Sequence, residues 1–314
     1  MKKFLLLLLW ITLYHLAPAQ VPSLFLDGVV STNLSERDMA ISPDGNEMYY
    51  TIQSNQHVFS TIVHRRKISE DKWSAADVAT FSGMSSDLEP SFSPDGKKLY
   101  FSSDRASAEK SSKDYDIWVV EKTSNGWSSP KNIGWPVNTT ANEFYPSITN
   151  DGSIYFTAEY DKGVGKEDIY VSKLTDGIFS NPVPLDTAIN SKLWEFNAFV
   201  APDESFIAFT SYGRKDDHGG GDLYISVKSN GAWKPAVNAS ALNSPQLDYC
   251  PFSFQDEFYF TSGRHSIKAT RESPITYKEL TKLYNGTLNG SENIYKVSLK
   301  EVLKSVMSPD QNKD

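Results

Sequence analysis

The stretch PSFSPDGKKLYFSSD, residues 90–104, places two short β-rich runs on either side of Ser93-Pro94-Asp95-Gly96. Proline presets φ for a turn and glycine accepts positive φ, so this tetrapeptide predicts a tight turn. Two β-rich runs joined by such a turn form a hairpin. The segment therefore predicts a pair of antiparallel strands.

The first half of this segment recurs along the chain with a period of roughly 50 residues, which matches the longer propeller repeats. Each copy is followed by a second β-rich run. The copies occupy residues 39–45, 90–96, 146–152, 197–203 and, in degenerate form, 251–256. Repetition on this scale predicts an architecture built from similar units.

A third β-rich run follows in each unit, at residues 57–62, 116–120, 168–171, 222–225 and 293–297. A second turn then leads to a fourth run in the first four units. Four short antiparallel strands per unit are typical of a β-propeller blade. We therefore predict an all-β fold, a single β-propeller of four-stranded antiparallel blades.

The two ends of the chain predict how the ring closes. The last unit stops after its third strand, and residues 22–35 resemble the fourth-strand region that precedes the other units. An N-terminal strand would complete the last blade and remove an unpaired strand edge. This arrangement gives five blades, and extra strands within residues 266–291 would make six.

These units resemble the repeats of TolB-like propellers, exported bacterial proteins with a Ser-Pro-Asp-Gly turn after the innermost strand. The most faithful copy runs from Asp87 through Ser93-Pro94-Asp95-Gly96 to Asp116-Ile117-Trp118. The resemblance implies the propeller fold. It also implies roles such as docking other envelope proteins or gating a peptidase. TolB-like proteins carry a second α/β domain and usually six blades, and neither is evident in this sequence.

The chain begins with features of a cleavable signal peptide, predicted over residues 1–19. Lys2 and Lys3 precede an apolar run, and Ala17-Pro18-Ala19 offers small residues for cleavage. We expect a propeller domain at residues 20–300, a C-terminal tail at residues 301–314, and a periplasmic or secreted location. The chain has a single cysteine, Cys250, so an intramolecular disulfide is excluded.

The net charge of −8 argues against nucleic acid or an anionic membrane as partner, because both need a basic surface. We expect no membrane insertion after cleavage of the signal.

An acidic residue stands just before the innermost strand of every unit, and a propeller would bring all five to one mouth of its channel. The second strand ends on the same face, where three arginines and Trp194 would join them. In one interpretation the carboxylates cap backbone N–H groups or pair with arginines of neighbouring blades. In the other, this rim binds a ligand. The predicted site residues are Glu36, Asp87, Glu143, Trp194, Glu195, Asp248, Arg105, Arg214 and Arg264.

Motifs for catalysis are missing: we find no Gly-x-Ser-x-Gly, His-Glu-x-x-His, Walker loop or Gly-x-Gly-x-x-Gly after a strand. We therefore predict a binding protein rather than an enzyme, with no catalytic residue, metal or cofactor. The expected partner is a protein or peptide. The alternative is a propeller that binds or cleaves carbohydrate at the acidic channel mouth.

Overall fold

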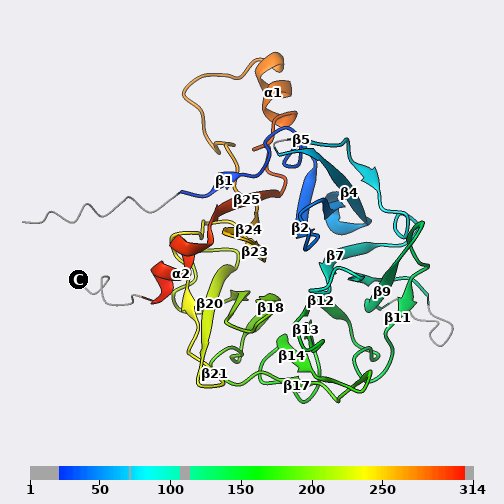
Figure 1. The fold of residues 1–314 in the computed structure, drawn as a ribbon. Coiled ribbons are helices and arrows are strands. Elements are labelled where there is room, and N and C mark those ends of the chain that lie inside the picture. The colour runs from blue at the N-terminus through cyan, green and yellow to red at the C-terminus, as the bar shows by residue number, and fades with distance from the viewer. Residues whose placement is uncertain (1–20, 71, 107–113, 308–314) are drawn as a thin grey trace, which may run out of the picture.

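The computed structural model describes residues 21–70, 72–106 and 114–307, and the predicted signal peptide lies outside this part. Five antiparallel sheets are arranged around a central axis, so the chain is a five-bladed β-propeller (Figure 1). The predicted fold class is thus confirmed. A sixth blade would have required extra strands within residues 266–291. This stretch contains a helix and no strand.

Each blade begins with an inner strand at the channel, followed by a second strand. The inner strands are β2 (Ser35–Ile41), β7 (Asp87–Phe92), β12 (Glu143–Ile148), β18 (Trp194–Val200) and β23 (Asp248–Phe254). The second strands are β3 (Glu47–Gln53), β8 (Lys98–Ser103), β13 (Ile154–Ala158), β19 (Phe206–Tyr212) and β24 (Glu257–Ser262). The predicted turn joins each pair: the Ser93 hydroxyl accepts from the Lys98 N–H at 2.9 Å, and Gly96 has a φ of +68°.

The third strands are β4 (Ser60–Ser69), β9 (Asp116–Thr123), β14 (Asp168–Ser172), β20 (Asp222–Ser229) and β25 (Asn293–Ser298). Short outer strands complete the first four blades. They are β5 (Lys72–Trp73), β6 (Asp77–Val78), β10 (Gly126–Trp127), β11 (Lys131–Asn132), β15 (Leu174–Thr175), β16 (Ile178–Phe179), β17 (Val183–Pro184), β21 (Ala232–Trp233) and β22 (Val237–Asn238).

The outer strand of blade five comes from the other end of the chain. β1 (Ser23–Leu24) pairs antiparallel with β25, with Ser23 opposite Lys296 and Leu24 opposite Tyr295. The predicted closure of the ring by the N-terminal strand is therefore confirmed. Pairing the chain ends covers the edge that β25 would otherwise expose.

The hydrophobic core is divided among the five interfaces between adjacent blades. Alternate residues of a strand face opposite sides of its sheet, so each blade contributes apolar side chains to both neighbours. Between blades one and two, for example, Tyr49 and Ile62 pack with Leu99, Phe101 and Trp118. Four further clusters fill the remaining interfaces.

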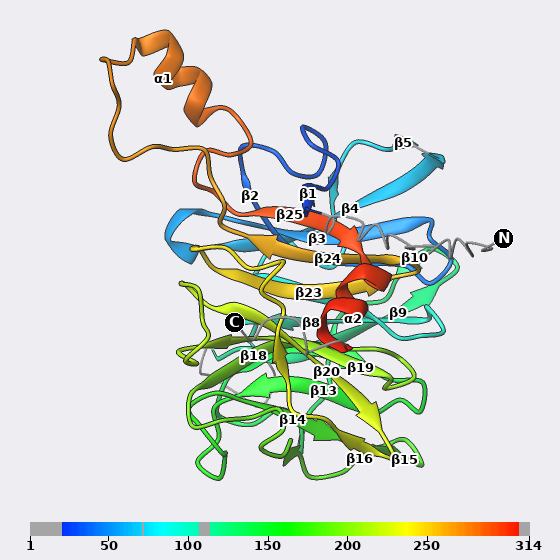
Figure 2. The same ribbon diagram turned by 90° about the vertical axis from the view of Figure 1, so that its left-hand side faces the viewer.

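The described ranges contain three short helices outside the blades. The 3₁₀ helix η1 (Asn55–His57) lies in the loop between β3 and β4, and α2 (Leu299–Met307) packs on blade five with Val302 and Val306 buried. α1 (Tyr277–Tyr284) stands away from the blades and buries none of its side chains (Figure 2). No helix in the described ranges is long and apolar enough to cross a membrane.

Candidate functional site

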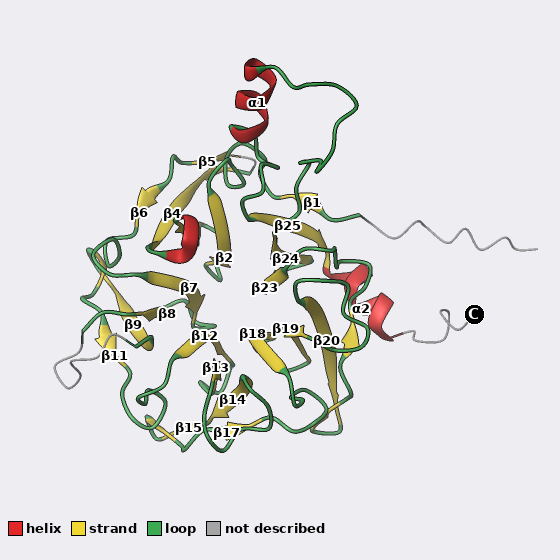
Figure 3. Ribbon diagram, turned by 180° about the vertical axis from the view of Figure 1, so that it is seen from behind, coloured by secondary structure: helices red, strands yellow, loops and turns green. Residues whose placement is uncertain are grey.

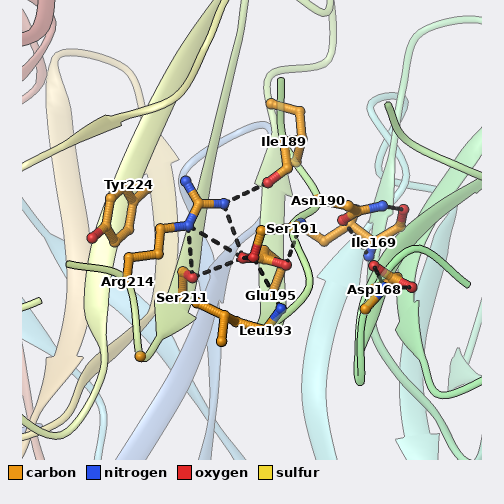
Figure 4. A network of polar contacts seen from close by, with 12 residues as sticks. Asp168, Ile169, Ile189, Asn190, Ser191, Leu193, Glu195, Ser211, Arg214 and Tyr224 are labelled. Atoms are coloured by element: carbon orange, nitrogen blue, oxygen red, sulfur yellow. Dashed lines mark hydrogen bonds and ion pairs between the residues drawn. The ribbon is translucent and has the colours of Figure 1, made fainter. Parts of the chain in front are cut away.

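The five acids that begin the inner strands are buried and hydrogen-bonded inside their own blades. In blade four, Glu195 is fully buried and accepts hydrogen bonds from the N–H and the hydroxyl of Ser191, both at 2.7 Å (Figure 4). It also accepts one from the Ser211 hydroxyl at 2.9 Å. The carboxylate thus joins the loop that enters the blade to the first two strands.

The same bonds recur around the ring. Glu143 accepts from the Thr139 hydroxyl at 2.6 Å, and Asp248 accepts from the Ser244 hydroxyl at 2.7 Å. Glu36 is bound in the same way by the N–H of Thr32, at 3.0 Å. Asp87 accepts from Ser82 at 2.8 Å and Ser103 at 2.6 Å. Unsatisfied carboxylates at these buried positions would be costly, so the serine and threonine partners stabilise the blades.

The three predicted arginines pair with the acid of their own blade. The N···O distances are 2.5 Å for Arg105–Asp87, 2.9 Å for Arg214–Glu195 and 3.3 Å for Arg264–Asp248. The expected pairing between neighbouring blades is therefore wrong. The reason is the hairpin register: Glu195 lies opposite Ser211, which brings Arg214 back over the carboxylate of its own sheet.

Trp194 is the one predicted site residue outside these ion pairs and hydrogen-bonded acids. It is half-buried, and the Lys166 Nζ lies 3.8 Å from the centre of its ring. Tyr212 packs beside it at 5.6 Å between ring centroids.

The residue two positions after each acid has a left-handed backbone. This position is occupied by Asp38, Glu89, Tyr145, Asn197 and Cys250, with φ between +44° and +63°. Each lies at a β-bulge, where the register with the second strand shifts. Such a conformation costs about 1–3 kcal/mol for a residue other than glycine, and it persists only where the surroundings enforce it.

Three of these five residues, Asp38, Glu89 and Cys250, form a buried group with the neighbouring Arg37 on the channel axis, which we call the central plug. Arg37 Nε lies 2.7 Å from Asp38 Oδ1, and Arg37 Nη2 lies 3.0 Å from Glu89 Oε1. The Cys250 thiol donates to Asp38 Oδ1 at 2.9 Å. The charge of Arg37 is thus balanced by two carboxyl groups, and burial raises the pKa of the Cys250 thiol.

A cavity of about 330 Å³ opens at the channel mouth on the side where the inner strands begin, and we call it the mouth pocket. Figure 3 looks onto this face of the propeller. Blades one to four line the pocket, and two plug residues contribute to its wall. Its lining residues are Arg37, Gln53, His57, Leu88, Glu89, Tyr115, Phe144, Glu167, Phe196 and Asn197.

Two carboxyl groups of the mouth pocket have unusual acidity. Burial raises the pKa of Glu89 to about 7, although the charge of Arg37 opposes the shift. Burial, followed by the negative charge of Glu89, raises the pKa of Glu167 to about 7. Placing charge in this pocket is therefore unfavourable unless a counter-charge accompanies it.

The opposite mouth has a different character. A cavity of about 420 Å³ lies there, lined by the Pro-Asp-Gly side of the inner strands and by apolar residues such as Phe92, Phe199, Phe252 and Phe254. Among the described residues, no three His, Cys, Asp or Glu side chains gather as a metal site. His218, in the loop between β19 and β20, forms a hydrogen bond with the Asp222 carboxyl group at 3.0 Å.

None of the nine predicted site residues lines the mouth pocket. The predicted acids lie on the same face of the propeller as the pocket, but their side chains are bonded within their own blades. The pocket residues on the inner strands lie one or two positions after these acids, and examples are Arg37, Phe144 and Asn197. Tyr115 and Glu167 occupy equivalent positions, each directly before the aspartate that begins the third strand of its blade. The backbone C=O of each accepts from the N–H of the next blade's acid. Their side chains differ, so the repeat pattern did not single them out.

The buried Glu143 gives a pH prediction. Burial raises its pKa from 4.5 to about 7, and the hydrogen bonds from Thr139 and Tyr160 only partly offset this. The folded state therefore holds the proton more tightly than the unfolded chain, so this contribution is present below pH 4.5 and is lost as the pH rises through 7. We expect Glu143→Gln to lose less stability than the parent protein between pH 4.5 and 7.5 in urea denaturation. Parallel losses would contradict the assignment.

The fold and its channel define the class: a five-bladed β-propeller with a plugged channel and a polar, aromatic pocket at one mouth. No protein-family model and no curated protein sequence matches the chain. Among solved structures, an endo-arabinase from Bacteroides thetaiotaomicron is 13% identical, with 88% of this chain and 97% of that chain covered and a TM-score of 0.54.

Two other solved structures show the range of similar propellers. An α-L-arabinofuranosidase from Lactobacillus brevis is 11% identical, covering 87% of this chain and 92% of that one, with a TM-score of 0.53. TolB from Acinetobacter baumannii is 14% identical over 85% of this chain, with a TM-score of 0.44. The chain spans just over half of that protein, 55%. The likenesses to the endo-arabinase and the arabinofuranosidase show the propeller fold alone.

Proposed function

We propose that this protein is an exported binding module that receives a protein or peptide ligand in the mouth pocket. The observation that carries the proposal is the pocket itself, a cavity of about 330 Å³ between four blades with the central plug at its inner end. Tyr115, Phe144 and Phe196 provide aromatic surface there. Aromatic side chains in a preformed pocket are typical anchoring points for a protein ligand.

The bonding of Glu89 favours binding over cleavage. Glu89 Oε1 accepts from Arg37 and Asn197, and Oε2 accepts from the Ser102 hydroxyl and the Tyr145 N–H. A carboxyl group held by four donors is poorly placed to exchange a proton with a substrate. Glycoside cleavage needs two working carboxyl groups. Of the two carboxyl groups in the described lining of the pocket, Glu89 and Glu167, only that of Glu167 makes no hydrogen bond or ion pair.

Carbohydrate binding or cleavage is the second candidate, and one observation favours it. The pKa values of Glu89 and Glu167 are both raised to about 7, which is the range that a general acid needs at neutral pH. Aromatic rings beside amide and guanidinium groups also suit a sugar ring.

A parallel screen tests the two candidates. We expect a phage-displayed peptide library panned on the immobilised protein to yield a peptide family, and a glycan array and a glycosidase panel to give no signal. Phe144→Ala should weaken the selected peptides about tenfold, the loss of one anchoring contact. Ile178→Ala, at a position 71% exposed on the outer strand β16, is the matched control and should change nothing. Glycan binding without peptide enrichment, or equal binding by both variants, would overturn the proposal.

A further inference from the structure

Glu167 is an unpartnered carboxyl group in the wall of the mouth pocket. It lies in the loop before β14, where its backbone C=O accepts from the Glu195 N–H at 2.9 Å. Its side chain makes no hydrogen bond or ion pair with any residue of the described ranges. The adjacent Lys166 does not neutralise it, because the ammonium group of that residue sits over the Trp194 ring at 3.8 Å.

Carboxyl groups outnumber cationic groups in and beside the described lining of the pocket. Among the described residues, Arg37 is the one arginine or lysine in the lining, and it is held by both Asp38 and Glu89 at 2.7 and 3.0 Å. One positive charge therefore faces three carboxyl groups when Glu167 is included. A cation entering the pocket would meet an unpaired carboxylate, whereas an anion would meet an excess of negative charge.

Aromatic rings stand beside this carboxyl group in the same lining. Tyr115 and Phe144 pack against each other with 5.0 Å between their ring centroids, and Phe196 completes the aromatic part of the wall. The face of an aromatic ring attracts ammonium and guanidinium groups, and the attraction grows when the cation is shielded from water. The methylene stem of such a side chain would pack on the same rings.

We propose that the mouth pocket recognises a basic side chain, lysine or arginine, of a partner polypeptide, with Glu167 as the counter-charge. This inference rests on the proposed function and names the chemistry of the ligand. A cavity of about 330 Å³ accommodates one such side chain, and its closed inner end limits how far the chain can enter. The raised pKa of Glu167 agrees with this role, because an arriving cation would favour the ionised carboxyl group.

Titration with designed pentapeptides tests the inference. The probes are acetylated, amidated Ala-Ala-X-Ala-Ala peptides in which X is lysine, arginine, norleucine or glutamate, measured by calorimetry or NMR on the full-length protein. We expect the lysine or arginine peptide to bind about tenfold more tightly than the norleucine peptide. Glu167→Gln should remove that difference and leave norleucine binding unchanged. Glu70→Gln, which alters an exposed carboxyl group in the turn between β4 and β5, is the matched control.

The outcomes separate this inference from the proposed function. Equal binding of lysine and norleucine peptides, tighter binding of the glutamate peptide, or no effect of Glu167→Gln would overturn recognition of a basic side chain. Peptide binding at the pocket would still stand in those cases. If none of the four probes and no library peptide binds, both proposals fail. A thermal melt of each variant confirms that it is folded.

Discussion

Replacing Glu195 with alanine is expected to lower the free energy of unfolding by about 3–5 kcal/mol, the usual cost of removing one partner of a buried ion pair. Glu195 is fully buried, and its carboxylate binds Ser191, Ser211 and Arg214 at once. Its loss leaves the Ser191 N–H without an acceptor in a largely dry site. It also leaves Arg214 without a counter-charge, because only the neutral Ser211 hydroxyl and Ile189 carbonyl still accept from the guanidinium group. The ring of Tyr224, 4.6 Å from Arg214, cannot replace a negative charge.

Urea denaturation followed by circular dichroism measures the effect. Glu121→Ala is the matched control, because its two ion pairs have N···O distances of 3.9 and 4.0 Å at the surface and should contribute less than about 1 kcal/mol. Glu195→Gln keeps the shape of the side chain and should fall between the two. If Glu195→Ala costs no more than Glu121→Ala, the acids of the inner strands do not stabilise the blades.

The blade architecture could be predicted because its chemistry is local. The Ser-Pro-Asp-Gly turn needs only residues that are close in sequence: Ser93 donates to Asp95 at 2.7 Å, and the Lys97 N–H donates to the same carboxylate at 3.0 Å. Hairpins of this kind recur at each unit, and repetition then predicts the ring. Closure by the N-terminal strand followed from counting strands per unit.

The pocket could not be predicted in the same way, because it depends on where the repeat is broken. An acid lies at the start of the inner strand of every blade, and each one stabilises its own blade in the same way. Such a repeated feature therefore contributes to the fold. Two positions later the side chains differ in every blade: Asp38, Glu89, Tyr145, Asn197 and Cys250. That variation marks the channel axis. The left-handed bulge that turns these residues toward the axis is a property of the hairpin register, which a strand pattern does not reveal.

The second large effect concerns closure of the ring, and Phe25→Ala tests it. Phe25 directly follows β1, is 7% exposed, and donates its backbone N–H to the Ile294 carbonyl at 2.8 Å. Its ring meets Tyr259 edge-on with 5.1 Å between centroids, inside the core between blades five and one. Removing a buried phenylalanine ring costs about 3–5 kcal/mol, and here the cavity forms where the two ends of the chain meet.

We expect Phe25→Ala to lose that free energy in denaturation and to self-associate in light scattering, because a loosened β1 exposes the edge of β25. Phe59→Ala is the matched control: Phe59 is 40% exposed in a loop of blade one, so its loss should cost less than about 1 kcal/mol. A midpoint for Phe25→Ala equal to that of Phe59→Ala would mean that the ring holds without β1. Since Phe25 is itself part of the core between blades five and one, such a result would place the energy of closure in the other side chains of that core.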